Sequence, residues 1–487
     1  MTLPDSPNFL VFLPTFNRPR MAAALLRELL AQAAGRRVHI QIYDDGSYCD
    51  YGEVLALVAA HPDRVAYRRG DNRGRAGLWQ TYNEVLEEAR RSQPDYLVFL
   101  QDHSAIADGF FERLDRAWRD IPDADKTVVN LPREPRTYLR WWSSVTLNIQ
   151  QFAATEILTS GWVDGSWFAG PKLWQLPLTP LEPDPPVIPP EIACRGPYPL
   201  IQLSEKILAA GGNLYTLLAP LLAPRLLPEP NPAARTVRVC ITTYNRPANL
   251  ALLLRQIAAE AADWEVRVDI YDDASTADYS AVRALVDSFG GRCRLFQAEK
   301  NLGKRGYWKT YHRILRSLAD VPEEYFVFLQ DDVEICDDFF DVILDCWRAV
   351  PERRKIALNL QVDNWGNDHR WTRKKCPVQT AGGRSFLLSG WFDGFWFGTK
   401  ATLEVLSYAV YAIDPQRWID DPRMSSGVFQ QITGRLTTVG YNIYRPAQSL
   451  VRVIPSPSVM NSDVRDGFPI HEVNFRGRAH PPKGDDY

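Results

Sequence analysis

Apolar and polar positions along the chain follow strand and helix periods in alternation, and the whole order occurs twice. The pattern predicts buried first strands at Phe9–Leu13 and Val237–Thr242. After an Asn-Arg-Pro turn, it predicts helices at Met21–Ala34 and Ala248–Ala261. Second strands at Val38–Tyr43 and Val266–Tyr271 run directly into Asp-Asp. Strand, helix and strand at this spacing predict a parallel βαβ unit with a right-handed crossover.

The next elements lead to a third acidic strand end. An Asn-x-Gly turn opens a helix predicted at Ala76–Arg90 and at Tyr307–Ala319. The most apolar strands follow at Tyr96–Leu100 and Tyr325–Leu329, and they too end in acidic residues. The carboxyl ends of parallel strands meet at the edge where open α/β sheets bind ligands, so we expect a site there.

The repeat spans a whole domain. VFLPTFN at Val11–Asn17 returns as VCITTYN at Val239–Asn245, and Gly161–Gly165 returns as Gly390–Gly394. The offset is 228 residues at first and 229 for the rest, which indicates duplication of a domain and not a short repeat. We therefore predict an α/β protein of two tandem Rossmann-like domains with mostly parallel sheets, residues 1–229 and 230–487. The Pro-rich segment Pro224–Ala234 is predicted to be the linker between the two domains.

Composition narrows the class of protein. The chain is 45% hydrophobic and 24% charged, as in ordinary soluble proteins, and its net charge of −3 gives no basic field for nucleic acid. Seven Cys without a C-x-x-C pair favour reduced thiols. The sequence shows neither a signal peptide nor an apolar run of membrane-spanning length. These features predict a cytoplasmic protein and leave a peripheral membrane contact open.

Acidic pairs at two neighbouring strand ends carry the candidate chemistry. Asp272-Asp273 and Asp331-Asp332 each follow a buried strand of the second copy. Adjacent carboxylates are costly to hold unless something neutralises them, and a divalent cation bridging a diphosphate would do so. The alternative is that Asp331-Asp332 only caps the next helix.

These segments, in this order, resemble the family 2 type of GT-A glycosyltransferases. The resemblance rests on Thr-Tyr-Asn-Arg-Pro, Tyr-Asp-Asp-Ala-Ser, Asn-Leu-Gly-Lys and Phe-Leu-Gln-Asp-Asp, and it covers about 110 residues of each copy. It implies two GT-A domains that bind a nucleotide-diphosphate sugar with Mn²⁺ or Mg²⁺. The donor-binding residues it implies are Thr243, Tyr244, Arg246, Asp272, Asp273, Asn301, Lys304 and Asp331. Asp332 would bind the metal, and His471 or His480 could complete the metal shell. Gln330 stands where the family has its first carboxylate.

The catalytic base is assigned by a looser likeness. Asp420-Asp421, in Trp-Ile-Asp-Asp, is similar to the Trp-Asp-Asp of some GT-A N-acetylglucosaminyltransferases, and we prefer this pair. Asp393 is the rival, although its Asp-Gly is also a turn signal that the first copy repeats.

The first copy keeps much of the pattern and changes one ligand. Its counterparts of the residues above are Thr15, Phe16, Arg18, Asp44, Asp45, Arg75, Asp102, His103 and Glu191. His103 replaces the carboxylate of Asp332. The first copy is therefore either a second transferase of different specificity or a decayed copy that is kept for packing.

The sequence thus predicts a metal-dependent hexosyl- or N-acetylhexosaminyltransferase. It would move a sugar from a nucleotide donor, UDP-linked by preference, to a saccharide or lipid-linked saccharide acceptor of a surface polysaccharide or glycolipid. Two alternatives stay open. One is a non-catalytic saccharide- or nucleotide-binding protein, and the other is a nucleotidyltransferase, although the Gly-rich phosphate loop usual for that class does not follow the first strand.

Overall fold

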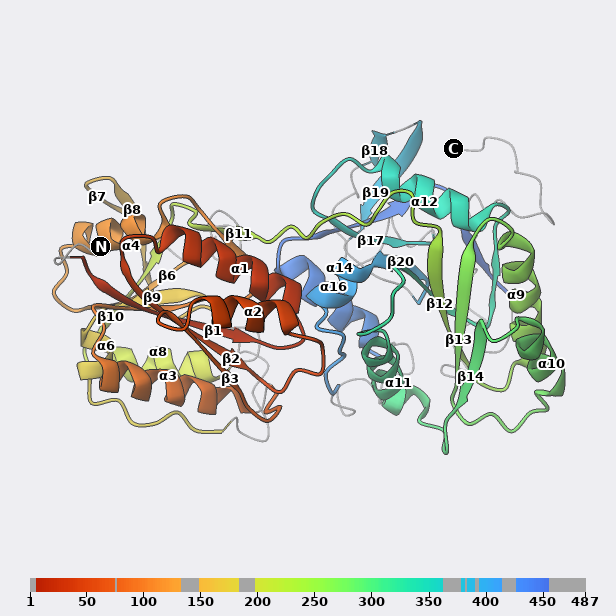
Figure 1. The fold of residues 1–487 in the computed structure, drawn as a ribbon, viewed down its shortest axis with the longest axis horizontal. Coiled ribbons are helices and arrows are strands. Elements are labelled where there is room, and N and C mark those ends of the chain that lie inside the picture. Colours follow the sequence, from red (N-terminus) through yellow and green to blue (C-terminus); the bar gives the residue numbers. More distant parts are fainter. Residues whose placement is uncertain are drawn as a thin grey trace. The chain divides into compact units, whose positions relative to one another are not determined.

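The 487-residue chain folds into two α/β units. The structure is a computed structural model that describes residues 6–74, 77–132, 149–183, 198–361, 378–381, 383–389, 394–413 and 426–454. The two compact units are Met1–Leu227 and Pro228–Tyr487. Each contains one large sheet with helices on both of its faces (Figure 1).

The first unit opens with the expected alternation of strands and helices. Its strands are β1 (Asn8–Thr15), β2 (Arg37–Asp44), β3 (Val65–Arg69), β4 (Tyr96–Phe99), β5 (Ser104–Ile106), β6 (Lys126–Asn130), β7 (Ile149–Phe152), β8 (Thr155–Ser160), β9 (Trp167–Ala169), β10 (Asn213–Leu217) and β11 (Leu222–Pro224). Its helices are α1 (Pro19–Gln32), α2 (Gly52–Ala60), α3 (Leu78–Ser92), α4 (Phe110–Asp120), α6 (Lys172–Gln175) and α8 (Tyr198–Ala209).

The second unit repeats this order. Its strands are β12 (Thr236–Thr243), β13 (Glu265–Asp272), β14 (Cys293–Gln297), β15 (Tyr325–Gln330), β16 (Val333–Ile335), β17 (Lys355–Asn359), β18 (Val378–Ala381), β19 (Arg384–Ser389), β20 (Trp396–Thr399), β21 (Asn442–Pro446) and β22 (Val451–Val453). Its helices are α9 (Pro247–Glu260), α10 (Ser280–Ser288), α11 (Gly303–Ser317), α12 (Phe339–Ala349), α14 (Lys400–Val405) and α16 (Val428–Thr438).

The two large sheets share one topology. The strand orders are β3-β2-β1-β4-β9-β6-β10-β8-β7 and β14-β13-β12-β15-β20-β17-β21-β19-β18, which correspond strand for strand. In the first sheet only β8 and β9 run against the other strands. The identical topology fits the internal duplication, and the structure confirms the predicted α/β class with two mostly parallel sheets.

Alternating strand residues bury both faces of each sheet. In the first unit Phe9, Val11 and Leu13 of β1 pack with α1, α2 and α4, while Leu10 and Phe12 pack with α3, α6 and α8 on the other face. The period of two along a strand produces this division. Trp167 and Trp396 are fully buried, so these two Trp belong to the core.

Most predicted boundaries differ from the observed ones by one or two residues, with two larger differences. Helix α11 begins at Gly303, four residues before the predicted start, because the helix starts directly at the glycine of the Asn-Leu-Gly turn, with Leu302 as its N-cap. The predicted linker begins too early, since Pro224 pairs with Ser104 in a small sheet. Arg225 is buried and bonds Glu28 and the carbonyl of Ser104, so it belongs to the first unit.

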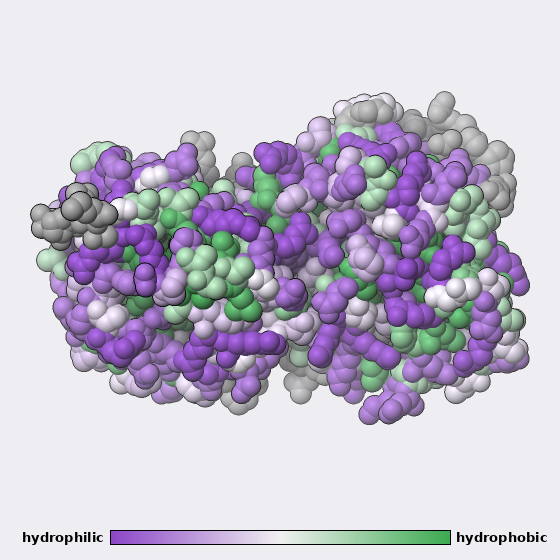
Figure 2. All heavy atoms as spheres, viewed as in Figure 1, coloured by the Kyte–Doolittle hydropathy of each residue, from purple (hydrophilic) through white to green (hydrophobic). Residues whose placement is uncertain are grey.

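Two further features of the structure concern the exterior of the protein and its cysteines. In Figure 2 the visible face is mostly hydrophilic with small apolar patches. Among the described residues, no helix is long and apolar enough to cross a membrane. The cysteines that the structure describes, Cys49, Cys240, Cys293, Cys336 and Cys346, are free thiols.

Candidate functional site

The predicted acidic residues meet at the carboxyl edge of each sheet. In the second unit β12 lies between β13 and β15, and all three strands are parallel. Their ends therefore lie side by side: Thr243 and Asp272 end β12 and β13 and are register partners, and Asp331 directly follows β15 at the same edge. This arrangement confirms the predicted convergence of strand ends.

A compact cluster forms where β12 and β15 end. The Thr243 hydroxyl donates to Asp331 Oδ2 at 2.7 Å, and the backbone N–H of Tyr244 donates to the same oxygen at 3.2 Å. Arg246 Nη1 donates to Asp331 Oδ1 at 3.2 Å and to Asp332 Oδ2 at 2.8 Å. Both carboxylates are at least 95% buried, with 3% and 1% exposure. Five of the predicted donor and metal residues are thus in direct contact.

The charges of this cluster do not balance. Asp331, Asp332 and Arg246 together carry one net negative charge when both carboxylates are ionised. Burial and the neighbouring Asp332 raise the pKa of Asp331 to about 6, and Arg246 only partly opposes them. Removing two carboxylates from water beside one guanidinium makes the site attractive to a further cation.

The first unit has the same arrangement of threonine, arginine and aspartate side chains, but a histidine replaces the second aspartate. Thr15 donates to Asp102 Oδ2 at 2.9 Å, and Arg18 Nη1 donates to Asp102 Oδ1 at 2.9 Å. His103 Nδ1 lies 3.3 Å from Asp102 Oδ1. Burial alone would raise the pKa of Asp102, but Arg18 and His103 outweigh it and lower the pKa to about 2. Asp102 and Arg18 form an ion pair, and His103 stands where the second unit has a second carboxylate.

Asp273 in the second unit and Asp45 in the first, which directly follow β13 and β2, each hold a turn. Asp273 accepts the backbone N–H of Leu302 and of Gly303, each at 2.9 Å, and thereby fixes the start of α11. Asp45 accepts those of Arg73 and Gly74 in the same way, at 2.9 and 3.0 Å. Asn301 is exposed and Lys304 half-buried at this turn. Arg75 lies outside the described residues.

Two further pairs of residues support the edge: Tyr51 and Tyr279 lie outside the motifs noted in the sequence, and Asn17 and Asn245 lie within them but had no role assigned. Tyr279 OH lies 2.8 Å from the Thr243 hydroxyl, and Tyr51 OH lies 2.7 Å from that of Thr15. The Asn245 side chain accepts the N–H of Thr276 at 2.8 Å, as Asn17 accepts that of Tyr48. Both pairs recur at the 228-residue offset, and that recurrence was the available signal.

Residues 10–167 match the glycosyl transferase family 2 model. The matched part ends at β9 and lies wholly in the first unit. It includes the strand ends that carry Thr15, Asp44 and Asp102. No curated protein matches the chain in sequence.

Several solved structures are similar to part of the chain. The mannosyltransferase PcManGT from Pyrobaculum calidifontis, in complex with GDP-Man and Mn²⁺, is 16% identical with a TM-score of 0.34, over 54% of this chain and 67% of that chain. TarS 1–349 from S. aureus is 16% identical with a TM-score of 0.31, over 45% and 60%. GalNAc-T7 with UDP, GalNAc and Mn²⁺ is 14% identical with a TM-score of 0.32, over 46% and 44%. The chain thus spans about two thirds or less of each.

The residues expected to act as base or to complete the metal shell lie outside the described residues. They are Asp393, Asp420, Asp421, His471, His480 and, in the first copy, Glu191. One neighbour of Asp393 is placed. A Cβ added to Gly394 would lie 2.6 Å from Gln330 Nε2, so this glycine lies against the residue that precedes Asp331.

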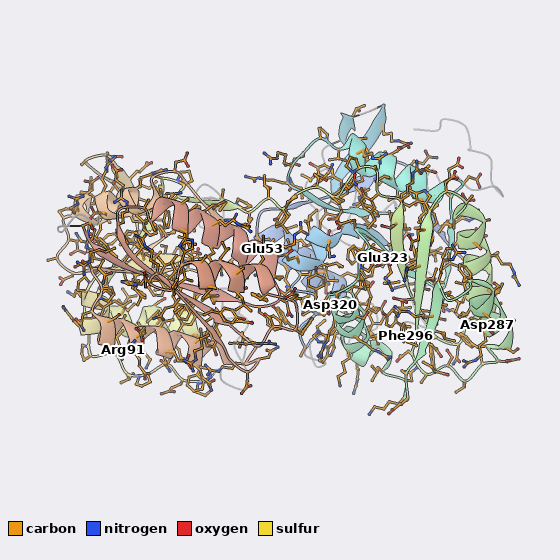
Figure 3. All side chains as sticks on the ribbon, viewed as in Figure 1. Glu53, Arg91, Asp287, Phe296, Asp320 and Glu323 are labelled. Atoms are coloured by element: carbon orange, nitrogen blue, oxygen red, sulfur yellow. The ribbon has the colours of Figure 1, made fainter. Side chains whose placement is uncertain are left out.

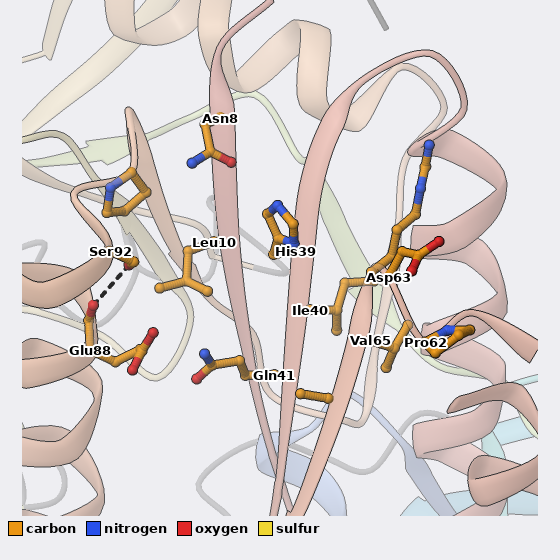
Figure 4. A pocket seen from close by; sticks show the side chains of 13 residues that line it. Asn8, Leu10, His39, Ile40, Gln41, Pro62, Asp63, Val65, Glu88 and Ser92 are labelled. Carbon is orange, nitrogen blue, oxygen red and sulfur yellow. Dashed lines mark hydrogen bonds between the residues drawn. The ribbon is translucent and has the colours of Figure 1, made fainter. Parts of the chain in front are cut away.

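A cavity of about 360 Å³ lies at the opposite edge of the first sheet (Figure 4). It is lined where β1, β2 and β3 begin, by side chains that include Asn8, Leu10, His39 and Gln41. The residue that begins β1 is Asn8, whereas Thr15, which ends β1, is in the candidate site. The cavity is therefore separate from that site.

The second unit fills the equivalent strand positions with charge. Arg238 and Asp269 replace Leu10 and Gln41 at the 228-residue offset. Arg238 bonds Asp269 Oδ2 at 2.7 Å and Glu323 Oε1 at 2.8 Å, and all three side chains are buried. Glu323, labelled in Figure 3, lies in the segment between α11 and β15, two residues before β15 begins. This buried ion cluster is a structural difference between the copies.

Proposed function

We propose that the chain is a glycosyltransferase that takes a sugar from a nucleotide-diphosphate donor and transfers it to a saccharide acceptor. The observation that carries the proposal is the pair of buried carboxylates, Asp331 and Asp332, that share Arg246 at the carboxyl edge of a parallel sheet. The match of residues 10–167 to glycosyl transferase family 2 supports the same reaction class.

A divalent cation fits the chemistry of this donor set. Mn²⁺ and Mg²⁺ prefer oxygen ligands and are commonly held by one or two carboxylates together with substrate phosphates. The described residues contain no group of three or more His, Cys, Asp or Glu that could hold a metal. The diphosphate would therefore supply most of the ligands. Asp332 would hold the cation, with His471 as a further candidate, and the cation would stabilise negative charge on the leaving diphosphate.

The chain's own residues would position the donor. Thr243, which ends β12, and Tyr244, which follows it, would line the nucleoside site beside Asp331. Asp273 would act through the turn it holds, because its two oxygens receive Leu302 and Gly303. Lys304, in the first turn of α11, would approach the base or the phosphates. A UDP-linked donor is the preferred form.

The base would be Asp420 or Asp421, with Asp393 as the rival. Asp→Asn at the true base is expected to reduce kcat steeply, by about 10²–10⁴-fold, and to spare donor affinity, because the base acts only as the bond forms. Single-turnover rates and UDP affinity, measured for all three variants, decide between them. Loss of donor binding together with turnover would assign the residue to the donor site instead.

The acceptor and the cellular setting are further parts of the proposal. We infer a saccharide or lipid-linked saccharide acceptor for surface polysaccharide or glycolipid synthesis, and a hexosyl or N-acetylhexosaminyl donor. The protein would act in the cytoplasm, with peripheral contact at the inner membrane face. These inferences rest on the resemblance and the tandem arrangement.

Turnover of labelled nucleotide sugars tests the proposal. Full-length protein with Mn²⁺ is expected to release UDP or GDP from at least one donor, through slow hydrolysis or transfer. Binding without release would favour a non-catalytic binding protein. Formation of a nucleotide sugar from a nucleoside triphosphate and a sugar phosphate would favour a nucleotidyltransferase.

A further inference from the structure

The two copies differ at the aspartate that ends the second strand of each sheet, Asp44 in β2 and Asp272 in β13. In the first unit Asp44 ends β2 and is 1% exposed. Its Oδ1 accepts the Ser47 N–H at 2.8 Å, and its Oδ2 accepts the Tyr67 hydroxyl at 2.6 Å. Arg69 Nε adds an ion pair to Oδ2 at 3.8 Å. Both carboxylate oxygens are therefore bonded by groups of the first unit itself.

Asp272, the counterpart in the second unit, lacks both of these partners. Strand register places Tyr67 beside Ile42 and Arg69 beside Asp44 in the first sheet, and Leu295 and Gln297 at these places in the second. Leucine has no donor, and Gln297 Nε2 bonds the Ser275 carbonyl at 3.4 Å instead.

The consequence is a buried acceptor with spare capacity. Asp272 is 3% exposed, and its Oδ1 accepts the Ser275 N–H at 3.1 Å and the Ser275 hydroxyl. Among the described residues, Oδ2 receives only the same N–H at 3.3 Å. A buried carboxylate oxygen is stabilised by a further donor, and the imide or amide N–H of a nucleobase is one of suitable chemistry.

We propose that Tyr67, with Arg69, occupies Asp44 and closes the first unit to the nucleobase, so that the chain binds one nucleotide donor, in the second unit, through Asp272. This inference rests on the proposed function. It adds that Tyr67 determines which of the two units binds the nucleotide donor. The family match to residues 10–167 describes that segment as a whole and does not say which side chains face a ligand.

The charges at the neighbouring strand ends agree with this assignment and are independent of it. The second unit combines Asp331 and Asp332 with Arg246, and retains one negative charge for a diphosphate-bound cation. The first unit pairs Asp102 with Arg18 and has His103 in place of the second carboxylate. The first unit thus has one carboxylate where the second unit has two.

Calorimetric titration of full-length protein with UDP and, separately, GDP in Mn²⁺ tests the proposal. Wild type is expected to bind one nucleotide per chain. Leu295→Tyr places the blocking hydroxyl in the second unit and should weaken binding at least about tenfold, the effect of one hydrogen bond to a charged group. Leu295→Phe is the matched control, since it adds the same ring without the hydroxyl and should bind more tightly than Leu295→Tyr.

The first unit supplies the reciprocal variant. Tyr67→Phe combined with Arg69→Gln should leave the affinity of the second unit unchanged, and a newly created second site would support the proposal further. Two nucleotides bound per wild-type chain, equal affinity of the Tyr and Phe variants at position 295, or loss of binding in the Tyr67 variant would each overturn it. Failure of wild type to bind either nucleotide would overturn the proposed function as well.

Discussion

Replacing Asp332 with Asn is expected to abolish Mn²⁺-dependent UDP binding without lowering the stability of the protein. The variant removes one of two buried carboxylates that face each other across Arg246, and leaves Asp331 and Arg246 as a neutral pair. Loss of even an outer-shell partner costs a metal site about 10–100-fold in affinity, and loss of a direct ligand should cost at least as much. Relief of repulsion between the carboxylates should hold the melting temperature at or above that of wild type.

The measurement is calorimetric titration with UDP in Mn²⁺ and in chelator, together with thermal melting. His103→Asn in the first unit is the matched control, and it should leave UDP affinity unchanged. Unchanged UDP affinity in Asp332→Asn would remove Asp332 from the metal site. A large fall in melting temperature would show that Asp332 serves the fold instead, as in the helix-capping alternative.

The pKa of Asp331 gives this prediction a pH dependence. The pKa of Asp331 is raised from 3.8 to about 6, so the folded protein favours the protonated carboxyl more than the unfolded chain does. Its contribution to stability is complete below about pH 4 and is lost as pH rises through about 6. Cation binding needs the ionised form, so UDP affinity in Mn²⁺ should be lower at pH 5 than at pH 7.5.

Much of the fold could be predicted from the sequence because hydrophobic periodicity and duplication carry the same information. The run Phe9–Leu13 is too short and too apolar for anything but a buried strand, and its repeat at Val237 supports the same assignment. The predicted start of α11 is four residues late because an Asn-x-Gly turn in a sequence indicates a turn ahead of a helix, whereas α11 begins at the glycine itself. Its glycine has a positive φ of 54° and is stabilised by the distant Asp273, which no local propensity reports.

The site could be predicted only in part, because the order of the motifs identifies the residues of the site but not the hydrogen-bond partners of each side chain. The convergence of Thr243, Arg246, Asp331 and Asp332 follows from parallel strands whose ends align. That Asp272 Oδ2 receives only the Ser275 N–H among the described residues depends on Leu295, a residue outside every motif, on the neighbouring strand β14. Comparing the copies position by position at β3 and β14 exposes this difference, since Tyr67 and Leu295 share a register position.

Replacing Arg238 with Leu, the residue that the first copy has at this position, is expected to destabilise the second unit by about 3 kcal/mol. Arg238 is 4% exposed and bonds Asp269 and Glu323, which are 1% and 3% exposed. Removing one partner of a buried ion pair costs about 3–5 kcal/mol, because the other charge stays buried without compensation. We expect the lower end, since Arg294 still bonds Asp269 at 2.8 Å and Arg267 lies 3.2 Å from Glu323.

Changing the whole cluster should restore what the single substitution removes. Arg238→Leu combined with Asp269→Gln and Glu323→Gln leaves no buried carboxylate at this place, and follows the first unit, where Leu10 and Gln41 hold the equivalent positions. Hydrogen exchange resolved to peptides of β12 and β13 measures the effect within the full chain, where two units need not unfold together. Exposed Arg255→Leu is the control, with a change within about 0.5 kcal/mol. If the single variant protects β12 as well as wild type does, the ion cluster contributes no net stability, and Arg238 is replaceable by the apolar residue that the first copy already uses.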